Sequence, residues 1–402
     1  MGVTDRRRKI TQVRSAMRQR TAGRRFGDDA MVRRRAIAGL LGLALSILVP
    51  ATSASASSPP PPPSPSAGSS VAVPAPVQLD GRTAPHVYSQ AESVQLNRQG
   101  GDPAVLNFWS PQRMATATPL DVGVSPAVAN RSPAASATRP LQIGSRPTGP
   151  IASRTPPGAS TPLTPTPITN FPPINGKLFF VEGGTSLPFV CSASAINSPS
   201  KREIITAAHC LHTGKGGSFS SNVMFAPGYD GRSTPSDPYG MFQASTLRVS
   251  TEWVTYGGPA LTTDTEPGYA RDVAFVTLYA GGNNNKNVVD AVGGHGFSYN
   301  GPYEFDASVF GYPMNNANGQ VMVGCYGTTM QDSNFTNRSL LGCNFDGGAS
   351  GGPWLDQYDN STGIGYVHGV TSTQTQTTPI VNGAAHFDDA TNTMFVMSQT
   401  DG

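Results

Sequence analysis

The prolines of this 402-residue chain are distributed very unevenly, and this limits where the chain can fold. Of its 36 prolines, 24 fall between residues 57 and 173, and 11 fall between residues 174 and 402. A segment this rich in Pro, Ser, Thr and Ala buries little apolar surface, so residues 57–173 are predicted to be a largely disordered pro-segment or linker. A single globular domain is predicted for residues 174–402.

The first 56 residues have the organisation of an export signal. Arg33-Arg34-Arg35 precede the apolar run 36–49, and the small residues Ala54-Ser55-Ala56 follow it. The apolar run is shorter than the roughly 20 residues that a membrane-spanning helix needs. The sequence therefore predicts secretion after cleavage of a signal at 1–56, with no stable membrane anchor. Met31 is an alternative start, because residues 31–56 alone have the proportions of a signal.

Charge separates the leader from the rest of the chain. Residues 1–35 carry 12 Lys and Arg against three Asp, whereas residues 171–402 carry nine Lys and Arg against 18 Asp and Glu. The formal net charge of +3 therefore conceals an acidic body. A surface with this excess of negative charge repels phosphates, so nucleic acid is not an expected partner.

Beyond residue 174, short runs rich in β-branched and aromatic residues alternate with clusters of Gly, Asn, Pro and Ser. No long helical periodicity is present. This pattern is typical of an all-β barrel or sandwich. The predicted strands lie at 177–181, 203–206, 272–278, 320–323 and 366–371.

All four cysteines lie in the predicted domain. An even number of cysteines in an exported chain indicates disulfides. Four cysteines allow three connectivities, and the sequential one, Cys191 with Cys210 and Cys325 with Cys343, fits the spacing best. A zinc site is disfavoured because the chain has no C-x2-C pair.

Three short motifs carry residues with catalytic chemistry. They are 205–210 (ITAAHC), 271–276 (RDVAFV) and 347–353 (GGASGGP). These motifs resemble the histidine, aspartate and serine motifs of the chymotrypsin-like serine proteases, in particular secreted actinobacterial members, and they occur in that family's order. The resemblance covers roughly residues 175–402. It implies two six-stranded antiparallel β-barrels with the active site at their interface.

The motifs suit the chemistry of acyl transfer. A serine hydroxyl is a weak nucleophile at neutral pH and needs an adjacent base, which an imidazole supplies. A carboxylate on the other ring nitrogen fixes the tautomer and stabilises the imidazolium. The assignment is Ser350 as nucleophile, His209 as general base and then acid, and Asp272 as the orienting group. The amides of Gly348 and Ser350 are the expected oxyanion hole.

Other interpretations of these residues remain open. If Asp272 is an ordinary cap or turn residue, Asp264 and Asp290 are the alternative carboxylates. The remaining histidines read as ordinary surface residues: His86, His212, His295 and His386. The aromatic segment 108–114 (FWSPQRM) is either a chance apolar cluster in a linker or part of a pro-segment that covers a cleft before maturation.

Two departures from the family pattern bear on activation. Ala349 precedes the nucleophile, where the animal digestive members have an aspartate that pairs with a newly cut N-terminus. The Ile-Val-Gly-Gly start that provides that terminus is also missing from the sequence. Removal of the leader from a zymogen is therefore expected to unmask a preformed site.

The resemblance places the base of the primary specificity pocket at Asn344 and its wall at 371–374, with Thr371, Ser372 and Thr373 as substrate-binding residues. The wall strand would pair with substrate main chain. Glutamyl endopeptidases have a histidine where this alignment places Thr371, and a shift of one loop would bring in His368 or Asp346. The preferred residue before the scissile bond stays open, with uncharged or small polar side chains favoured.

Three function classes follow from the sequence. The first is a secreted serine endopeptidase, monomeric, acting on protein or peptide substrates. The second is a non-catalytic secreted peptide-binding protein on the same fold. The third is an esterase with the same triad. No metal or cofactor is expected in catalysis, and the Asn-rich stretch 283–287 reads as a solvated turn rather than a calcium site.

Overall fold

The computed structural model describes the part of the chain that carries the motifs. The described residues are 101–124, 139–149 and 168–401, apart from 336 and 377, together with the backbone of 91–95 and 160–162. The chain divides into two units, Met1–Gln78 and Leu79–Gly402, and every described residue belongs to the second unit. The predicted export signal lies outside the described residues.

The first β-sheet closes into a barrel. Antiparallel pairing of Phe242 with Phe225 and of Gln243 with Met224 joins the two ends of a ring of strands. The predicted strands at 177–181 and 203–206 belong to this ring, and their residues are buried because the apolar side chains fill the barrel. In ring order the strands are β10 (Phe242–Ser250), β12 (Ala274–Leu278), β8 (Glu203–Thr206), β7 (Pro188–Ala195), β6 (Asn175–Val181) and β9 (Ser221–Pro227).

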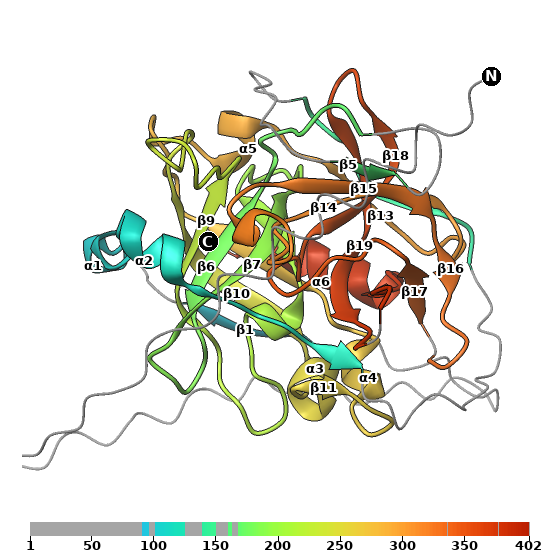
Figure 1. Cartoon of the computed structure of the whole chain (residues 1–402). Coiled ribbons are helices and arrows are strands. Elements are labelled where there is room, and N and C mark those ends of the chain that lie inside the picture. Colours follow the sequence, from blue (N-terminus) through green and yellow to red (C-terminus); the bar gives the residue numbers. More distant parts are fainter. Residues whose placement is uncertain are drawn as a thin grey trace, which may run out of the picture. The chain divides into compact units, whose positions relative to one another are not determined.

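The second sheet curls into a half-barrel whose described strands follow an open path. Its core contains the buried side chains of Val309, Leu341 and Trp354. In path order the strands are β16 (Met330–Gln331), β17 (Arg338–Leu341), β20 (Asn382–Ala385), β19 (Ile364–Gln374), β18 (Pro353–Asp359), β14 (Asp306–Gly311), β15 (Val323–Thr328) and β5 (Ser160–Pro162). The all-β fold class is confirmed. In Figure 1 the green and yellow strands of the first sheet lie beside the orange and red strands of the second.

One predicted strand is largely wrong. Residues 320–322 precede β15, which begins at Val323, because a short 3-10 turn, η3 (Ala317–Gly319), is closed by a hydrogen bond from Gln320 N to Ala317 O. Five further short strands of the described residues pair with the sheets off these paths: β2 (Thr118–Pro119), β3 (Gly123–Val124), β4 (Gln142–Ser145), β11 (Ala260–Leu261) and β13 (Gly296–Tyr299).

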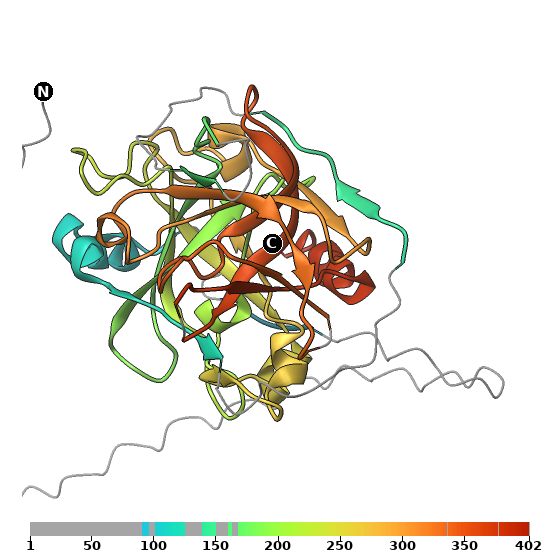
Figure 2. The same cartoon turned by 45° about the vertical axis from the view of Figure 1, so that its right-hand side comes forward.

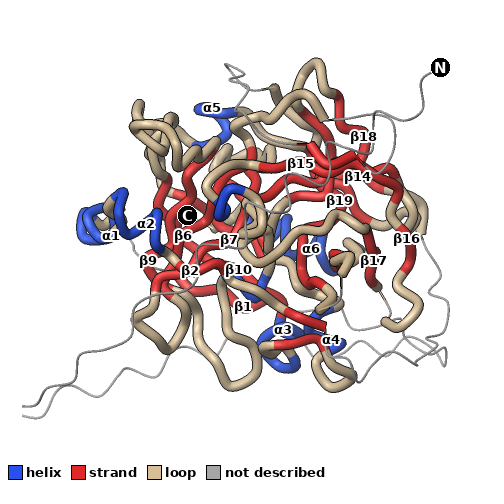
Figure 3. Tube along the Cα trace, in the orientation of Figure 1, coloured by secondary structure: helices blue, strands red, loops and turns tan. Residues whose placement is uncertain are grey.

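The helices are short, and strands and loops make up most of the domain (Figure 3). Within the described residues no helix is both long and apolar enough to cross a membrane. The longest is α6 (Asp389–Ser398), the red helix in Figure 2, which Asp388 caps and which contacts β12 and β10 of the first barrel. The others are α1 (Pro103–Phe108), α2 (Pro111–Thr116), α3 (Thr251–Tyr256), α4 (Glu266–Tyr269) and α5 (Val288–Val292), with the 3-10 turn η2 (Ala208–Cys210).

Parts of the Pro-rich region are ordered against the domain, which its composition did not predict. Helices α1 and α2 each begin with a proline after an Asp or Ser cap, an arrangement that prolines tolerate. Between them Trp109 is only 2% exposed, packs on Phe179 with ring centroids 5.5 Å apart, and donates its indole N–H to Asn222 O at 2.6 Å. The aromatic segment is therefore part of the core of the first barrel. The backbone of β1 (Ala91–Gln95) also pairs with β10.

Candidate active site

The disulfides fix the segments on either side of the candidate site. His209 lies in η2, directly after β8, and the bond between Cys191 and Cys210 ties η2 to β7. The bond between Cys325 and Cys343 joins β15 to the loop that leads into the serine motif. The cysteines are thus paired sequentially, as expected. Cys191, His209 and Cys210 cluster as metal ligands would, but their two sulfurs are bonded to each other, so no thiolate is left to bind zinc.

His209 and Asp272 form a buried hydrogen-bonded pair. His209 Nδ1 lies 2.8 Å from Asp272 Oδ2, and the His209 main-chain amide donates to Asp272 Oδ1 at 2.9 Å. Ser372 Oγ donates to the same carboxylate at 2.5 Å. Asp272 is fully buried and His209 is 7% exposed. A carboxylate in this position holds the proton on Nδ1 and leaves the Nε2 lone pair available as a base.

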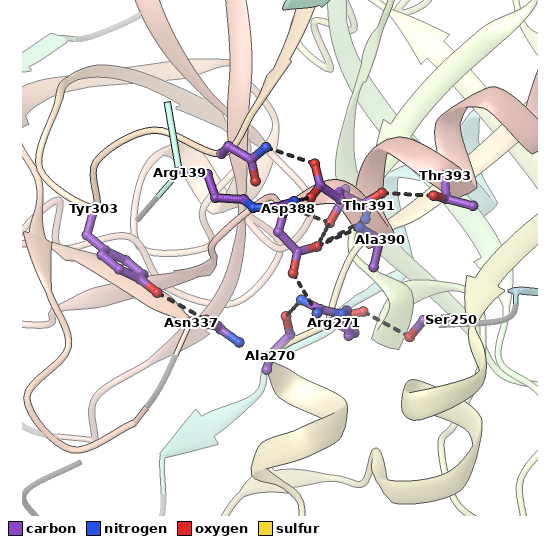
Figure 4. Close-up of polar contacts among 12 residues, drawn as sticks. Arg139, Ser250, Ala270, Arg271, Tyr303, Asn337, Asp388, Ala390, Thr391 and Thr393 are labelled. Carbon is purple, nitrogen blue, oxygen red and sulfur yellow. Dashed lines mark hydrogen bonds and ion pairs between the residues drawn. The ribbon is translucent and has the colours of Figure 1, made fainter. Parts of the chain in front are cut away.

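The loop that carries Asp272 is anchored from two sides. The guanidinium of Arg271 pairs with Asp388 Oδ2 at 2.6 Å, and Ser250 Oγ donates to the Arg271 carbonyl at 3.4 Å. Asp388 is also the cap of α6, where its side chain accepts from the amides of Ala390 and Thr391 (Figure 4). Arg271, the neighbour of Asp272 in the chain, is therefore held between β10 and α6.

The serine motif lies where the two sheets meet. The Ser192 amide of β7 donates to Ser350 O, and the Gly351 amide donates to Thr371 O of β19, both at 2.7 Å. Gly351 has a φ of +79°, and a Cβ there would lie 2.0 Å from Thr206 Oγ1, so only glycine fits. Ser350 is 6% exposed. A Cβ at Gly351 would also lie 2.9 Å from Ala207 N, two residues before His209, so the serine and histidine motifs are neighbours. His209 Nε2 is buried and has no hydrogen-bond partner, so it is not bonded to Ser350 Oγ in this structure.

Gly348 presents its amide away from the serine loop. Its φ is +90°, and a Cβ there would lie 2.7 Å from Tyr312 O. Ser192 Oγ donates to Gly348 O at 2.9 Å and accepts from the Tyr312 amide at 3.0 Å. These bonds fix the peptide group between Gly348 and Ala349. The Gly348 amide itself donates to Leu120 O at 2.9 Å, so it faces a carbonyl oxygen as an oxyanion donor must.

The side chains of the predicted wall strand are already engaged within the protein. Thr371 Oγ1 accepts from Trp354 Nε1 at 3.0 Å, Thr373 Oγ1 bonds the guanidinium of buried Arg338, and Ser372 bonds Asp272. What this strand offers to a ligand is therefore its main chain. The role of Ser372 as a donor to the carboxylate was missed in the sequence, since no motif around it signals that contact.

The remaining candidates for the specificity pocket differ in burial and in their hydrogen-bond partners. Asn344 is exposed, and its Oδ1 accepts from the Ile380 amide at 3.3 Å. His368 is 3% exposed and bonds Ser298 Oγ through Nδ1 at 3.0 Å, and burial lowers its pKa to about 3. His368 is thus a neutral core residue. Asp346 is half-buried and accepts from the side-chain amide of Gln374 at 3.0 Å, next to the serine motif.

The alternative carboxylates lie elsewhere. Asp264 is exposed on the turn before α4, and Asp290 belongs to α5, where it lines a separate pocket with Tyr239 and Lys286. The prediction of surface histidines is wrong for His212, His295 and His386, which are buried. The Nδ1 of His212 accepts from the Gly214 amide at 3.1 Å, and burial lowers the pKa of this histidine. Among the three candidate carboxylates, Asp272 is the one bonded to His209.

Among solved structures the chain is similar to a thermostable serine protease, AL20, from an extremophilic microorganism. The match has 29% sequence identity and a TM-score of 0.50, and it covers 57% of this chain and 98% of that chain. The chain has the chymotrypsin-like serine protease fold.

Two further solved structures align with this fold. They are protease Anisep from Arthrobacter nicotinovorans, at 26% identity over 62% of this chain and 96% of that chain with a TM-score of 0.47, and a Glu endopeptidase, at 17% identity over 55% and 89% with a TM-score of 0.42. No family model matches the sequence, and no curated protein matches it.

Proposed function

We propose that this chymotrypsin-like protein is a secreted serine endopeptidase that uses Ser350, His209 and Asp272 through an acyl-enzyme intermediate. The observation that carries the proposal is the buried bond from His209 Nδ1 to Asp272 Oδ2, at 2.8 Å, beside the serine motif. Two disulfides and an export-type leader are in keeping with an extracellular enzyme.

Acylation begins when Ser350 Oγ attacks the scissile carbonyl carbon and His209 Nε2 takes the hydroxyl proton. Asp272 stabilises the imidazolium that forms, and Ser372 holds the carboxylate in position. The carbonyl oxygen gains negative charge and is bound by the amides of Gly348 and Ser350. Loss of one such donor typically reduces transition-state stabilisation by about 3 kcal/mol.

The acyl-enzyme forms when His209 returns the proton to the leaving amine and the carbon–nitrogen bond breaks. Water then attacks the ester carbonyl while His209 Nε2 accepts its proton. Collapse of the second tetrahedral intermediate releases the carboxylate product and restores the proton to Ser350 Oγ. The step requires a neutral imidazole at His209.

Labelling with a fluorophosphonate tests the proposal against a non-catalytic binding protein. The reagent should attach to the natural chain and fail to attach to Ser350→Ala or His209→Ala. Labelling that persists in Ser350→Ala, or that never occurs even after the leader has been removed by an added protease, contradicts the assignment.

The choice of substrate distinguishes an endopeptidase from an esterase. An endopeptidase cleaves an unfolded protein and a peptide amide, whereas an esterase turns over a short acyl ester and leaves amides intact. Rates measured side by side on an ester and an amide with the same acyl group decide between the two.

Secretion, removal of the leader from a zymogen and a monomeric state are part of the same proposal. Comparing the mass of the mature extracellular form with that of the precursor tests the maturation steps.

A further inference from the structure

A short piece of the Pro-rich region, residues 118–124, crosses the candidate active site. We call these residues the crossing segment. Main-chain hydrogen bonds hold it between the two sheets, among them Leu120 N to Val190 O of β7 (3.0 Å), Gly348 N to Leu120 O (2.9 Å) and Gln374 N of β19 to Val122 O (3.1 Å).

These contacts use the groups that the mechanism assigns to substrate. The Gly348 amide is the proposed oxyanion donor, and β19 is the strand expected to pair with substrate main chain. The crossing segment adds to both sheets in parallel register, with Thr118 opposite Phe189 and Gly123 opposite Gln374. Recognition through main-chain pairing is the general mode of strand addition to a sheet.

Packing leaves no space for a second chain at this point. Val122 is 5% exposed. A Cβ at Gly347 would lie 3.0 Å from Asp121 Cβ, and one at Gly348 would lie 3.3 Å from Pro119 Cβ. The crossing segment therefore lies in van der Waals contact with the two glycines that open the serine motif.

Two carboxylates near the crossing segment, those of Asp121 and Asp346, affect how strongly the segment is held. Gln374 donates its side-chain amide to Asp346, and Asp121 of the crossing segment accepts from the same side chain. Partial burial and the negative charge of Asp346 raise the pKa of Asp121, although part of its side chain remains exposed. Two carboxylates at one amide repel each other when both are ionised.

We infer that residues 118–124 are an intramolecular occupant of the substrate groove and inhibit the intact chain until they leave it. This inference rests on the proposed function. The segment is anchored on one side by Trp109 in the first barrel and at its other end by β3, which pairs in parallel with β11. A tethered competitor acts at a high effective concentration, so it raises the apparent KM for substrate and leaves kcat unchanged.

Variants of the full chain test the inference. Val122→Asp places a charge at a buried position of the segment, and Leu120→Pro removes the amide that bonds Val190. Each should lower KM for a peptide substrate by about tenfold, the effect of 1.4 kcal/mol, with kcat within about twofold. Asp121→Asn removes the repulsion from Asp346 and should raise KM. Gln112→Asp, an exposed position of α2, is the matched control and should leave KM unchanged.

The inference and the proposed function are contradicted by different results. If Val122→Asp and Leu120→Pro both keep the KM and the fluorophosphonate labelling rate of the Gln112→Asp control, the inference is wrong and the proposed function stands. If no variant is labelled at Ser350, even after an added protease has removed the leader, the proposed function fails and the inference fails with it. Circular dichroism of each variant identifies misfolding, and either groove variant that folds is sufficient for the comparison.

Discussion

The buried carboxyl group of Glu203 makes the stability of the domain depend on pH, and the substitution Glu203→Gln should remove that dependence. Glu203 is fully buried in β8. Ser200 Oγ donates to it at 3.1 Å, and Thr277 Oγ1 lies 3.2 and 3.3 Å from its two oxygens. Thr277 Oγ1 also bonds Ser398 O of α6 at 3.3 Å, so its single proton cannot serve all three oxygens. A protonated Glu203 resolves this by donating to Thr277.

The magnitude follows from the two pKa values. Burial raises the pKa of Glu203 from its usual 4.5 to about 8. Between these values the folded chain keeps a proton that the unfolded chain has lost, so the free energy of unfolding falls as pH rises. The slope approaches 1.4 kcal/mol per pH unit, and the loss reaches about 5 kcal/mol by pH 8. Below the unfolded value the contribution is complete.

Urea unfolding of the natural chain and of Glu203→Gln, at several pH values between about 4 and 9, measures this effect. Subtracting one curve from the other cancels every other titrating group. The variant should be about 1 kcal/mol less stable in acid, where its extra amide N–H has no acceptor, and more stable near pH 8. Exposed Glu304→Gln is the control. A difference that stays constant with pH refutes the argument.

Three more expectations follow from single contacts. Ser372→Ala removes a charge-assisted bond to Asp272, so kcat should fall about tenfold, and Ser372→Thr, which keeps the hydroxyl, should restore it. Burial lowers the pKa of Lys177 from 10.5 to about 7, so the stability of the natural chain should rise with pH between these values, while Lys177→Met, compared by denaturant unfolding, should lack that rise. Trp109→Ala should reduce the free energy of unfolding by about 3–5 kcal/mol, and a loss below about 1 kcal/mol would show that the leader is not part of the core.

The fold was predictable where side-chain pattern decides the structure. The runs at 177–181 and 203–206 became strands because their apolar side chains fill a closed barrel. The run at 320–323 failed because a main-chain hydrogen bond from Gln320 closes a turn first. The composition of the Pro-rich region was misleading at Trp109 and Met114, since a few apolar side chains suffice to order a segment once a barrel surface is available.

The contact between His209 and Asp272 was predictable because each residue has a local motif, and the role of Ser350 as nucleophile stays a prediction. Ser372 was expected only as a wall residue, because its contact with Asp272 depends on the register of β19 rather than on its neighbours in sequence. The crossing segment could not be predicted as a groove ligand, since it is held mainly by main-chain groups that every sequence possesses.

The open path of the second sheet has a consequence for any shortened form of this protein. The backbone of β5 pairs with residues 324–326 along the outer edge of β15, whereas the ring of the first barrel needs no such cover. A chain trimmed to its protease sheets would leave that row of amides and carbonyls unpaired. Unpaired edges recruit strands from neighbouring molecules, so a mature form that is monomeric should keep the 160–162 stretch attached when the rest of the leader is removed.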